Sequence, residues 1–413
     1  MNNLILISYH FPPAGGNSAP ASLRLGKFAQ YLPEFGWNPL VVSAGRENYD
    51  LLDESLMFEY KTPVNRVRNY LGRFRGRDRL MTWLPSPSLL LPWSINAVLA
   101  ASKLAKMKTV KLILASSPPS ASFLAGYLTH KLTGLPLVLD YRDQWTLSPY
   151  RTGPRFYMIW DRWLETQILK HSRLVIVSNA GRLTEHYAYW KYISPKVIII
   201  PNGFDIKDFE DVKPDRCAGH NLKSEVVIRH VGAIHGARVA TTRSLLNTLN
   251  EYLTDRPDAP TIRVQFTGSV QNVLLMPHSL HSSKLIIEHQ RQAFYKDALA
   301  LELGADLLLL IIGRHAQSNA ETSSKIFEYL ASGRPILVAG ESRLLRNLTT
   351  GLDRVFFIGD NPSQEAFADL FNWLNNHGKG DNCAQGCSWF NKYLRSYNRR
   401  NIAHKLAIKL DEL

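Results

Sequence analysis

The chain has 413 residues, of which 45% are hydrophobic and 20% charged, with 25 glycines and 22 prolines. This composition excludes a disordered or a fibrous protein. At roughly 100 to 200 residues per domain, the length predicts two domains that each bury a core. The net charge of +14 predicts attraction to anions, but it does not distinguish phospholipids, nucleic acid and phosphorylated substrates.

The first half of the chain has short apolar runs separated by longer stretches, as in a parallel sheet that is buried on both faces. The clearest helix follows the first run: Pro20 suits an early helical position, an apolar stripe follows, and Pro33 with Gly36 ends it. The strands expected in this half cover residues 4–8, 39–44, 111–117, 135–140, 173–179 and 196–202.

The second half repeats this plan, which predicts an α/β protein with two Rossmann-like, doubly wound parallel sheets. Its expected strands cover residues 225–232, 261–268, 284–289, 305–313, 334–340 and 354–359. Residues 204–224 are rich in Asp, Lys, Pro and Gly and show no apolar period, which predicts a linker. The predicted divisions are a first domain at 1–203, a linker at 204–224, a second domain at 225–387 and a C-terminal helix at 388–413.

The positive charge is concentrated in residues 61–111, where eleven Lys and Arg stand against Asp78 alone. Residues 80–102 carry no charge, but three prolines interrupt them, so we do not expect a membrane span. Two interpretations remain open. The segment lies on an anionic bilayer, or it is a buried helix beside a solvated basic loop. In the first case the contacts would be Arg73, Arg75, Arg77, Arg79 and Trp83.

The cysteines and the first residues of the chain indicate the cellular compartment of the protein. Cys383 and Cys387 have no matching Cys or His pair and Cys217 stands alone, so we expect neither a disulfide nor a zinc site. The start MNNLILISYHFPP lacks the pattern of a secretory signal, so we expect a cytosolic protein.

The loop after the first strand is the first candidate site. Gly15 and Gly16 would let backbone N–H groups approach an anion in front of the following helix. In open α/β sheets, ligands bind outside the carboxyl ends of the strands, where this loop lies. The loop has neither a dinucleotide fingerprint nor a P-loop pattern, so a purely structural turn is equally open.

A second candidate site follows the strand at 305–313. Ser323 or Ser324 is expected to cap a short helix whose N-terminus attracts phosphate oxygens. Lys325 opposes the helix dipole there, which an anion would explain, and Glu328 is placed to accept ribose hydroxyls. The plain alternative for both is a solvated helix surface.

Two further clusters end predicted strands. Asp140, Arg142 and Asp143 follow a buried strand, where charged groups need a function or partners, and opposite signs could satisfy each other. Arg238 follows the first strand of the second half, where a guanidinium could bind a diphosphate by two hydrogen bonds.

In this order, ISYHFPPAGG, LPEFGW, SSPPSASFLAGYLTHKLTGLPLVLDYRDQW, PNGFD, HVGAIHGAR and KIFEYLASGRPIL resemble the family 4 glycosyltransferases of GT-B fold. The resemblance is strongest to the bacterial branch that builds capsule, exopolysaccharide and O-antigen. It implies two domains facing a cleft and a retaining transfer from a nucleotide diphosphate sugar, UDP- or GDP-linked, without metal or cofactor. It also implies a glycan or lipid-linked acceptor and a cytoplasmic protein, peripheral on the inner face of the plasma membrane.

The resemblance assigns roles to individual residues. Glu328 matches the second Glu of the family's Glu-x7-Glu motif, which holds the ribose, whereas Ala320 stands in place of the first Glu and Glu321 is one position off. Arg238 lies near the position of the family's basic residue that binds the diphosphate, with Lys325 as the candidate to replace the missing lysine partner. The pair at 142 and 143 falls where many members have His-Asp near the reacting sugar, which makes Arg142 and Asp143 the catalytic candidates.

Three alternatives remain beside this interpretation. The first is a GT-B-fold nucleotide-sugar epimerase. The second is a basic protein that binds nucleic acid, although the basic stretch has no helix-turn-helix, RNP or zinc-finger pattern and we expect no such partner. The third is an inactive membrane scaffold, which Ala320 motivates.

Overall fold

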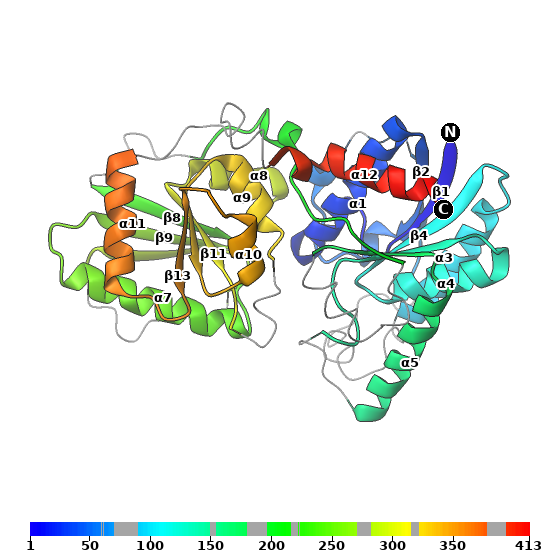
Figure 1. Cartoon of the computed structure of the whole chain (residues 1–413), viewed down its shortest axis with the longest axis horizontal. Coiled ribbons are helices and arrows are strands. Elements are labelled where there is room, and N and C mark those ends of the chain that lie inside the picture. The colour runs from blue at the N-terminus through cyan, green and yellow to red at the C-terminus, as the bar shows by residue number, and fades with distance from the viewer. Residues whose placement is uncertain are drawn as a thin grey trace. The chain divides into compact units, whose positions relative to one another are not determined.

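The chain forms two compact α/β units, each described here by itself (Figure 1). The first contains Met1–Asn202 and Arg399–Leu413, and the second contains Gly203–Asn398. The computed structural model describes residues 1–58, 60, 62–69, 90–148, 154–179, 196–215, 222, 224–270, 282–314, 322–377 and 394–413.

The first unit is built on a seven-stranded parallel sheet with the order β3-β2-β1-β4-β5-β6-β7. Its strands are β1 Asn2–Ile7, β2 Trp37–Ala44, β3 Val64–Val67, β4 Val110–Ser117, β5 Leu137–Tyr141, β6 Leu174–Val177 and β7 Val197–Ile199. Its helices are α1 Ala19–Tyr31, α3 Leu91–Leu104, α4 Ala121–Thr133, α5 Arg155–His171 and α12 Arg399–Asp411.

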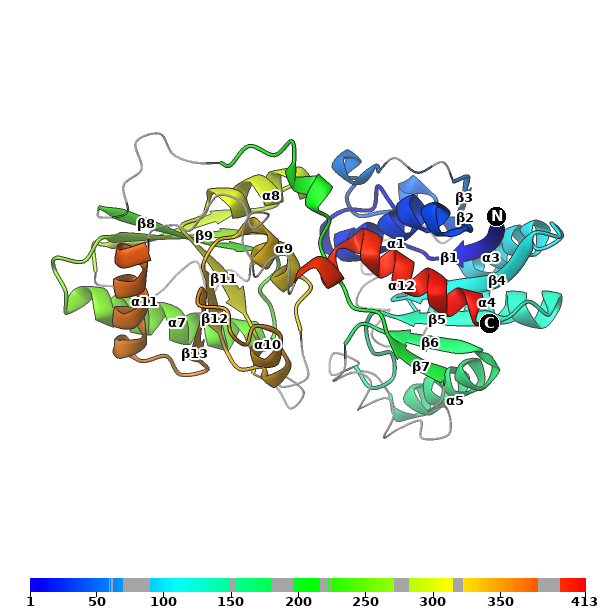
Figure 2. The ribbon, with the colours of Figure 1, turned by 45° about the horizontal axis from the view of Figure 1, so that its top comes forward.

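Alternate side chains of the buried strands enter two cores, one on each face of this sheet. Leu4 and Leu6 of β1 pack with residues of α1 and α12. Ile5 and Ile7 pack with residues of α3, α4 and α5 on the opposite face. Figures 1 and 2 show α12 beside α1, so the C-terminal helix completes the layer that the first helix begins.

The second unit has a six-stranded parallel sheet with the order β10-β9-β8-β11-β12-β13. Its strands are β8 Glu225–Val231, β9 Thr261–Thr267, β10 Leu285–Gln290, β11 Leu307–Ile311, β12 Ile336–Ala339 and β13 Val355–Gly359. Its helices are α7 Ala237–Thr254, α8 Tyr295–Gly304, α9 Lys325–Ser332, α10 Arg343–Leu348 and α11 Gln364–His377. Residues of α7 and α11 enter the core on one face, and residues of α9 and α10 enter the core on the other.

The two predicted doubly wound sheets are confirmed. All twelve predicted strands form, and the structure adds β3 at the edge of the first sheet. Within the expected linker, Phe204 is buried in a core of the second unit, and the closing helix at 399–411 packs in the first unit. None of the described helices is both long and apolar enough to cross a membrane.

The uncharged stretch at 80–102 is described from residue 90 onward. There α3 buries Trp93, Ala97, Val98 and Ala101 against the first sheet, as the buried-helix interpretation expects. The residues predicted to contact the membrane, Arg73, Arg75, Arg77, Arg79 and Trp83, lie outside the described residues.

Candidate functional site

The strand order reverses between β8 and β11 in the second unit, which is where ligands bind in open α/β sheets. Gly232 follows β8 with a φ of 138°, and its N–H donates to the Thr267 carbonyl at 2.6 Å. Gly268, with a φ of 129°, follows β9, and a Cβ there would lie 2.6 Å from the Gly232 oxygen. Glycines therefore let the backbones at the ends of two adjacent strands approach each other closely.

The side chain of Lys325 lies over Gly232. A Cβ on Gly232 would overlap both Cε and Nζ of Lys325, so the ammonium group occupies the space that a side chain at 232 would fill. Lys325 is the first residue of α9, and Ser324 before it makes no side-chain capping bond. Lys325 and Ser324 thus stand at a helix N-terminus as predicted, whereas the predicted cap by the Ser324 side chain does not form.

Arg238 lies in the first turn of α7, a helix of 18 residues. The residue before the helix, Gly236, has a φ of 59° and no side chain to cap it. The guanidinium of Arg238 donates to the Ala233 carbonyl at 3.4 Å. The positive ends of α7 and α9 thus each carry a basic side chain, although a helix dipole favours anions there.

Arg238 and Lys325 both affect the pKa values of two nearby histidines, His230 and His235. The pKa of His230 is lowered to about 3, chiefly by burial, with Lys325 and Arg238 acting in the same direction and a hydrogen bond to Leu309 acting against them. Partial burial lowers the pKa of His235, and the same two cations act in the same direction. Arg238 and Lys325 therefore act on a common region, at the switch point of the second sheet.

His230 is neutral at physiological pH, with its proton on Nδ1. Nδ1 lies 2.8 Å from the Leu309 carbonyl, which can only accept a hydrogen bond. Nε2 is buried and has no hydrogen-bond partner among the described residues. Sequence reasoning missed His230 because a histidine within an apolar strand segment, EVVIRHV, is typical of a core position.

Glu328 lies on α9 one turn after Lys325 and is half-buried. The hydroxyl of Tyr295 contacts it at 3.4 Å and contacts Asp208 at 3.0 Å. Nearby Glu302 of α8 is 3% exposed, and burial raises its pKa well above the ordinary value, helped by Glu328 and opposed by Lys325. Glu302 and Glu328 thus lie close enough for the carboxylate of Glu328 to disfavour a charge on the buried Glu302.

At the first sheet, the glycine loop is tied down within the protein. The N–H of Gly15 donates to the Leu51 carbonyl at 2.9 Å, and a Cβ there would lie 2.7 Å from that of Asp53. Gly16 has a φ of 60° and begins a short 3-10 turn before α1. The N–H of Gly15 is therefore already paired with the Leu51 carbonyl, and of the two glycines Gly16 is the one whose backbone geometry requires glycine.

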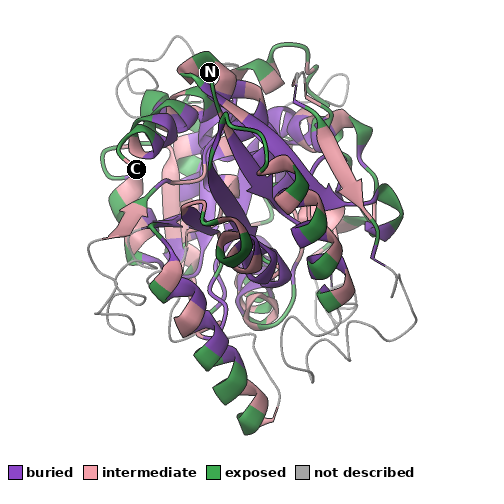
Figure 3. Cartoon of the chain, turned by 90° about the vertical axis from the view of Figure 1, so that its right-hand side faces the viewer, coloured by how far each residue is buried: buried purple, intermediate pink, exposed green. Residues whose placement is uncertain are grey.

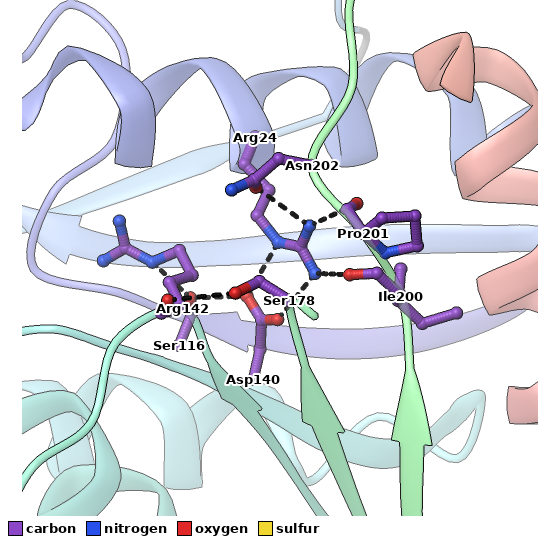
Figure 4. Close-up of polar contacts among 8 residues, drawn as sticks. All are labelled: Arg24, Ser116, Asp140, Arg142, Ser178, Ile200, Pro201 and Asn202. Atoms are coloured by element: carbon purple, nitrogen blue, oxygen red, sulfur yellow. Dashed lines mark hydrogen bonds and ion pairs between the residues drawn. The ribbon is translucent and has the colours of Figure 1, made fainter. Parts of the chain in front are cut away.

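A buried ion pair lies at the carboxyl edge of the first sheet (Figure 4). Arg24 of α1 donates to Asp140 of β5 at 2.9 and 3.2 Å, and the two side chains are 2% and 0% exposed. Arg24 also donates to the carbonyls of Ile200 and Pro201 after β7, at 3.0 and 2.8 Å. The guanidinium therefore joins the first helix to the ends of two strands.

Asp140 and Arg142 do not pair directly but meet through a serine (Figure 4). The hydroxyl of Ser116 donates to Asp140 at 2.8 Å, and Arg142 Nε donates to the Ser116 oxygen at 3.1 Å. Arg142 also donates to the Pro118 carbonyl. Burial lowers the pKa of Arg142 to about 10, against Asp140 and Asp143, so it remains charged at neutral pH.

Asp143 is exposed in the loop after β5. Its side chain lies at the carboxyl end of the first sheet, as the sequence predicts, and its assignment as a catalytic residue stays a prediction. Ala320 and Glu321 lie outside the described residues. Among the described residues, no group of His, Cys, Asp and Glu could hold a metal ion.

No protein-family model and no curated protein matches the sequence. Solved structures do match it along the whole chain. Sucrose-phosphate synthase from Thermosynechococcus elongatus is 14% identical with a TM-score of 0.68, covering 100% of this chain and 99% of its own. The chain has the GT-B fold.

Two more GT-B structures show the range of proteins that share this fold. A glycosyltransferase from Rickettsia africae is 12% identical with a TM-score of 0.56, and the match covers 100% of this chain and 97% of that one. A putative UDP-N-acetylglucosamine 2-epimerase from Listeria monocytogenes is 12% identical with a TM-score of 0.58 and the same coverage. At these identities the likeness establishes the fold, and function has to be argued from the site.

Proposed function

We propose that this GT-B protein is a retaining glycosyltransferase of the family 4 type that uses a UDP- or GDP-linked sugar. The acceptor would be a glycan or a lipid-linked sugar in bacterial cell-surface polysaccharide synthesis. The protein would act in the cytoplasm, peripheral on the inner face of the plasma membrane, without metal or cofactor. The observation that carries the proposal is the pair of cations, Arg238 and Lys325, at the N-termini of α7 and α9.

These two cations suit a diphosphate chemically. A guanidinium can hold two phosphate oxygens at once, and an ammonium adds a compact charge beside them. Gly232 leaves room for Lys325 at the strand end, which supports its role as the second basic partner. The half-buried carboxylate of Glu328, held by the Tyr295 hydroxyl, would accept the ribose hydroxyls.

The mechanism follows from where charge develops. The bond between the anomeric carbon and the diphosphate breaks as positive charge grows on the sugar ring and negative charge on the leaving oxygens. Arg238, Lys325, the N–H groups near Ser324 and both helix ends stabilise that negative charge. Gly15 and Gly16 would shape the donor side of the first unit, and Arg142 and Asp143 would lie near the reacting sugar.

The test is calorimetric titration with UDP, GDP and their common sugars. We expect Arg238→Ala, Lys325→Met and Glu328→Gln each to weaken nucleotide affinity by about 10- to 100-fold, the value of a charge-assisted hydrogen bond. Arg243→Ala is the matched control, because Arg243 is exposed on the same helix as Arg238. Unchanged affinity in the three variants would show that the site is assigned wrongly.

An epimerase is the second candidate, because a putative UDP-N-acetylglucosamine 2-epimerase shares the fold. Incubation with a nucleotide sugar in the absence of any acceptor separates the two. An epimerase would convert the sugar while it stays linked to the nucleotide. A transferase would instead hydrolyse the donor slowly, with water as the acceptor, and release the free nucleoside diphosphate.

A further inference from the structure

The helix α5 carries an apolar stripe that faces away from its own core. Phe156, Ile159, Trp160 and Trp163 follow the i, i+3, i+4, i+7 spacing of one helix face and are 62%, 69%, 52% and 52% exposed. The opposite side of the helix buries Leu164, Ile168 and Leu169 in the core. Packing within the first unit does not account for these exposed aromatic side chains. A contiguous exposed apolar patch of this kind indicates a surface that something else covers.

A second exposed apolar row lies on α3, a helix of the same layer. Leu91, Ile95 and Leu99 of α3, at i, i+4 and i+8, are 42%, 50% and 66% exposed. Helices α3, α4 and α5 all pack into the core on one face of the first sheet, so their outer sides form one surface. Figure 3 shows exposed residues recurring along α5, the helix that reaches furthest from its sheet in Figure 1.

The charges on this surface have a single sign. Helices α3 and α4 contain no Asp or Glu, and the two acids of α5, Asp161 and Glu165, are each 1% exposed. The exposed charged side chains of the three helices are Lys103, Lys131, Arg155, Arg162 and Lys170. Arg155 and Arg162 directly flank the aromatic stripe.

We propose that the outer surface of α3, α4 and α5, called here the aromatic face, is where the protein lies on an anionic phospholipid bilayer. Tryptophan and phenylalanine rings enter the boundary between headgroups and acyl chains, and basic side chains around them attract anionic headgroups. An anionic bilayer offers both an apolar layer for these rings and negative headgroups for the exposed cations around them, whereas a neutral or basic partner would not match the positive charge of this surface. The inference names the membrane-facing surface for the peripheral location proposed above, and it rests on that location and not on sugar transfer.

Flotation of the full chain with vesicles tests this surface. We expect binding to vesicles of phosphatidylcholine with phosphatidylglycerol, weak binding to phosphatidylcholine alone, and loss of binding as salt screens the headgroups. Trp160→Ser with Trp163→Ser should lower the vesicle partition coefficient by about tenfold or more. Arg155→Gln and Arg162→Gln should each lower it by about fivefold, since one basic residue contributes about that much near an anionic surface.

Ile408→Ser is the matched control, because Ile408 is 46% exposed on α12, on the other face of the same sheet. Equal flotation of the tryptophan variant and the parent chain would overturn the proposal, as would an equal loss in Ile408→Ser. A tryptophan variant that changes only the oligomeric state in size-exclusion chromatography would assign the face to a second copy instead. Titration of the same variants with UDP or GDP reports on the sugar-nucleotide site separately, and we expect no change there.

Discussion

At the carboxyl edge of the first sheet, Arg24 and Asp140 face each other as a buried pair, whereas at that of the second sheet two cations act on the same region. The first arrangement is closed, since its charges and the carbonyls at 200 and 201 satisfy one another. In the second, burial lowers the pKa of His230 and His235, and both Arg238 and Lys325 add to that lowering. The carboxyl edges of the two sheets thus hold charge in different ways, one as a closed ion pair that joins structural elements and one as two cations that suit an anion.

The largest expected effect on stability comes from breaking the buried pair of Arg24 and Asp140. Arg24→Met leaves Asp140 buried without its cation, which should lower the free energy of unfolding by about 3 to 5 kcal/mol. Urea unfolding followed by circular dichroism measures it. Arg46→Ala is the control, because Arg46 and its partner Glu54 are 48% and 61% exposed, and such a pair contributes at most about 1 kcal/mol.

The double variant Arg24→Met/Asp140→Leu should recover part of the loss, because no carboxylate is then buried at 140 without its cation. Full recovery is not expected, since two backbone carbonyls lose their donor. An Arg24→Met protein as stable as Arg46→Ala would show that the pair is not what joins α1 to the strand ends.

A smaller effect on stability is expected at Glu165, a buried carboxyl of the same unit whose pKa is raised. Burial raises the pKa of this carboxyl from 4.5 to about 7, although Thr146 donates a hydrogen bond to it. Between those values the folded state holds a proton that the unfolded state has lost, so stability falls as pH rises through the window.

Glu165→Gln removes this titration. We expect the variant to be more stable than the parent chain above pH 7 by roughly 3 kcal/mol, with the difference shrinking towards pH 4.5. Thermal unfolding across this pH range measures the difference. Parallel curves for the two proteins would mean that the carboxyl is already ionised in the folded state.

The smallest effect on stability tests the second arrangement. Gly232→Ala and Gly351→Ala both place a side chain at positive φ, of 138° and 82°, which should cost about 1 to 2 kcal/mol each. Only the first also displaces Lys325, because a Cβ on Gly351 meets no atom within 4 Å. Nucleotide affinity should therefore fall in Gly232→Ala alone, and an equal affinity in the two variants would exclude Lys325 from the binding of the diphosphate.

The sequence predicts the strands well because their signal is local. Buried parallel strands read as unbroken apolar runs, and all twelve such runs form strands. The edge strand β3, VNRV, was missed because it pairs only with β2 and its residues are half-buried, so it does not need an apolar run. It also lies within the basic stretch at 61–111, and Arg66 interrupts its apolar residues.

The candidate site was predictable only in part, for the same reason. Lys325, Ser324 and Arg238 follow from helix starts that are visible in the sequence. Arg24 and Asp140 are 116 residues apart, and no local pattern pairs them. A signal was present: Arg24 lies one turn before Phe28 on the buried side of the first helix, where a charge requires a buried partner.

The position of α12 has a consequence for how the protein is made. The core beneath α1 includes Ile402, Ala403, Leu406 and Leu410, so residues near the C-terminal end complete a core that residue 4 begins. On the ribosome the first unit must wait, with one side of its sheet incompletely covered, until the whole second unit has been synthesised. Chaperone capture of the nascent chain would be expected during that interval.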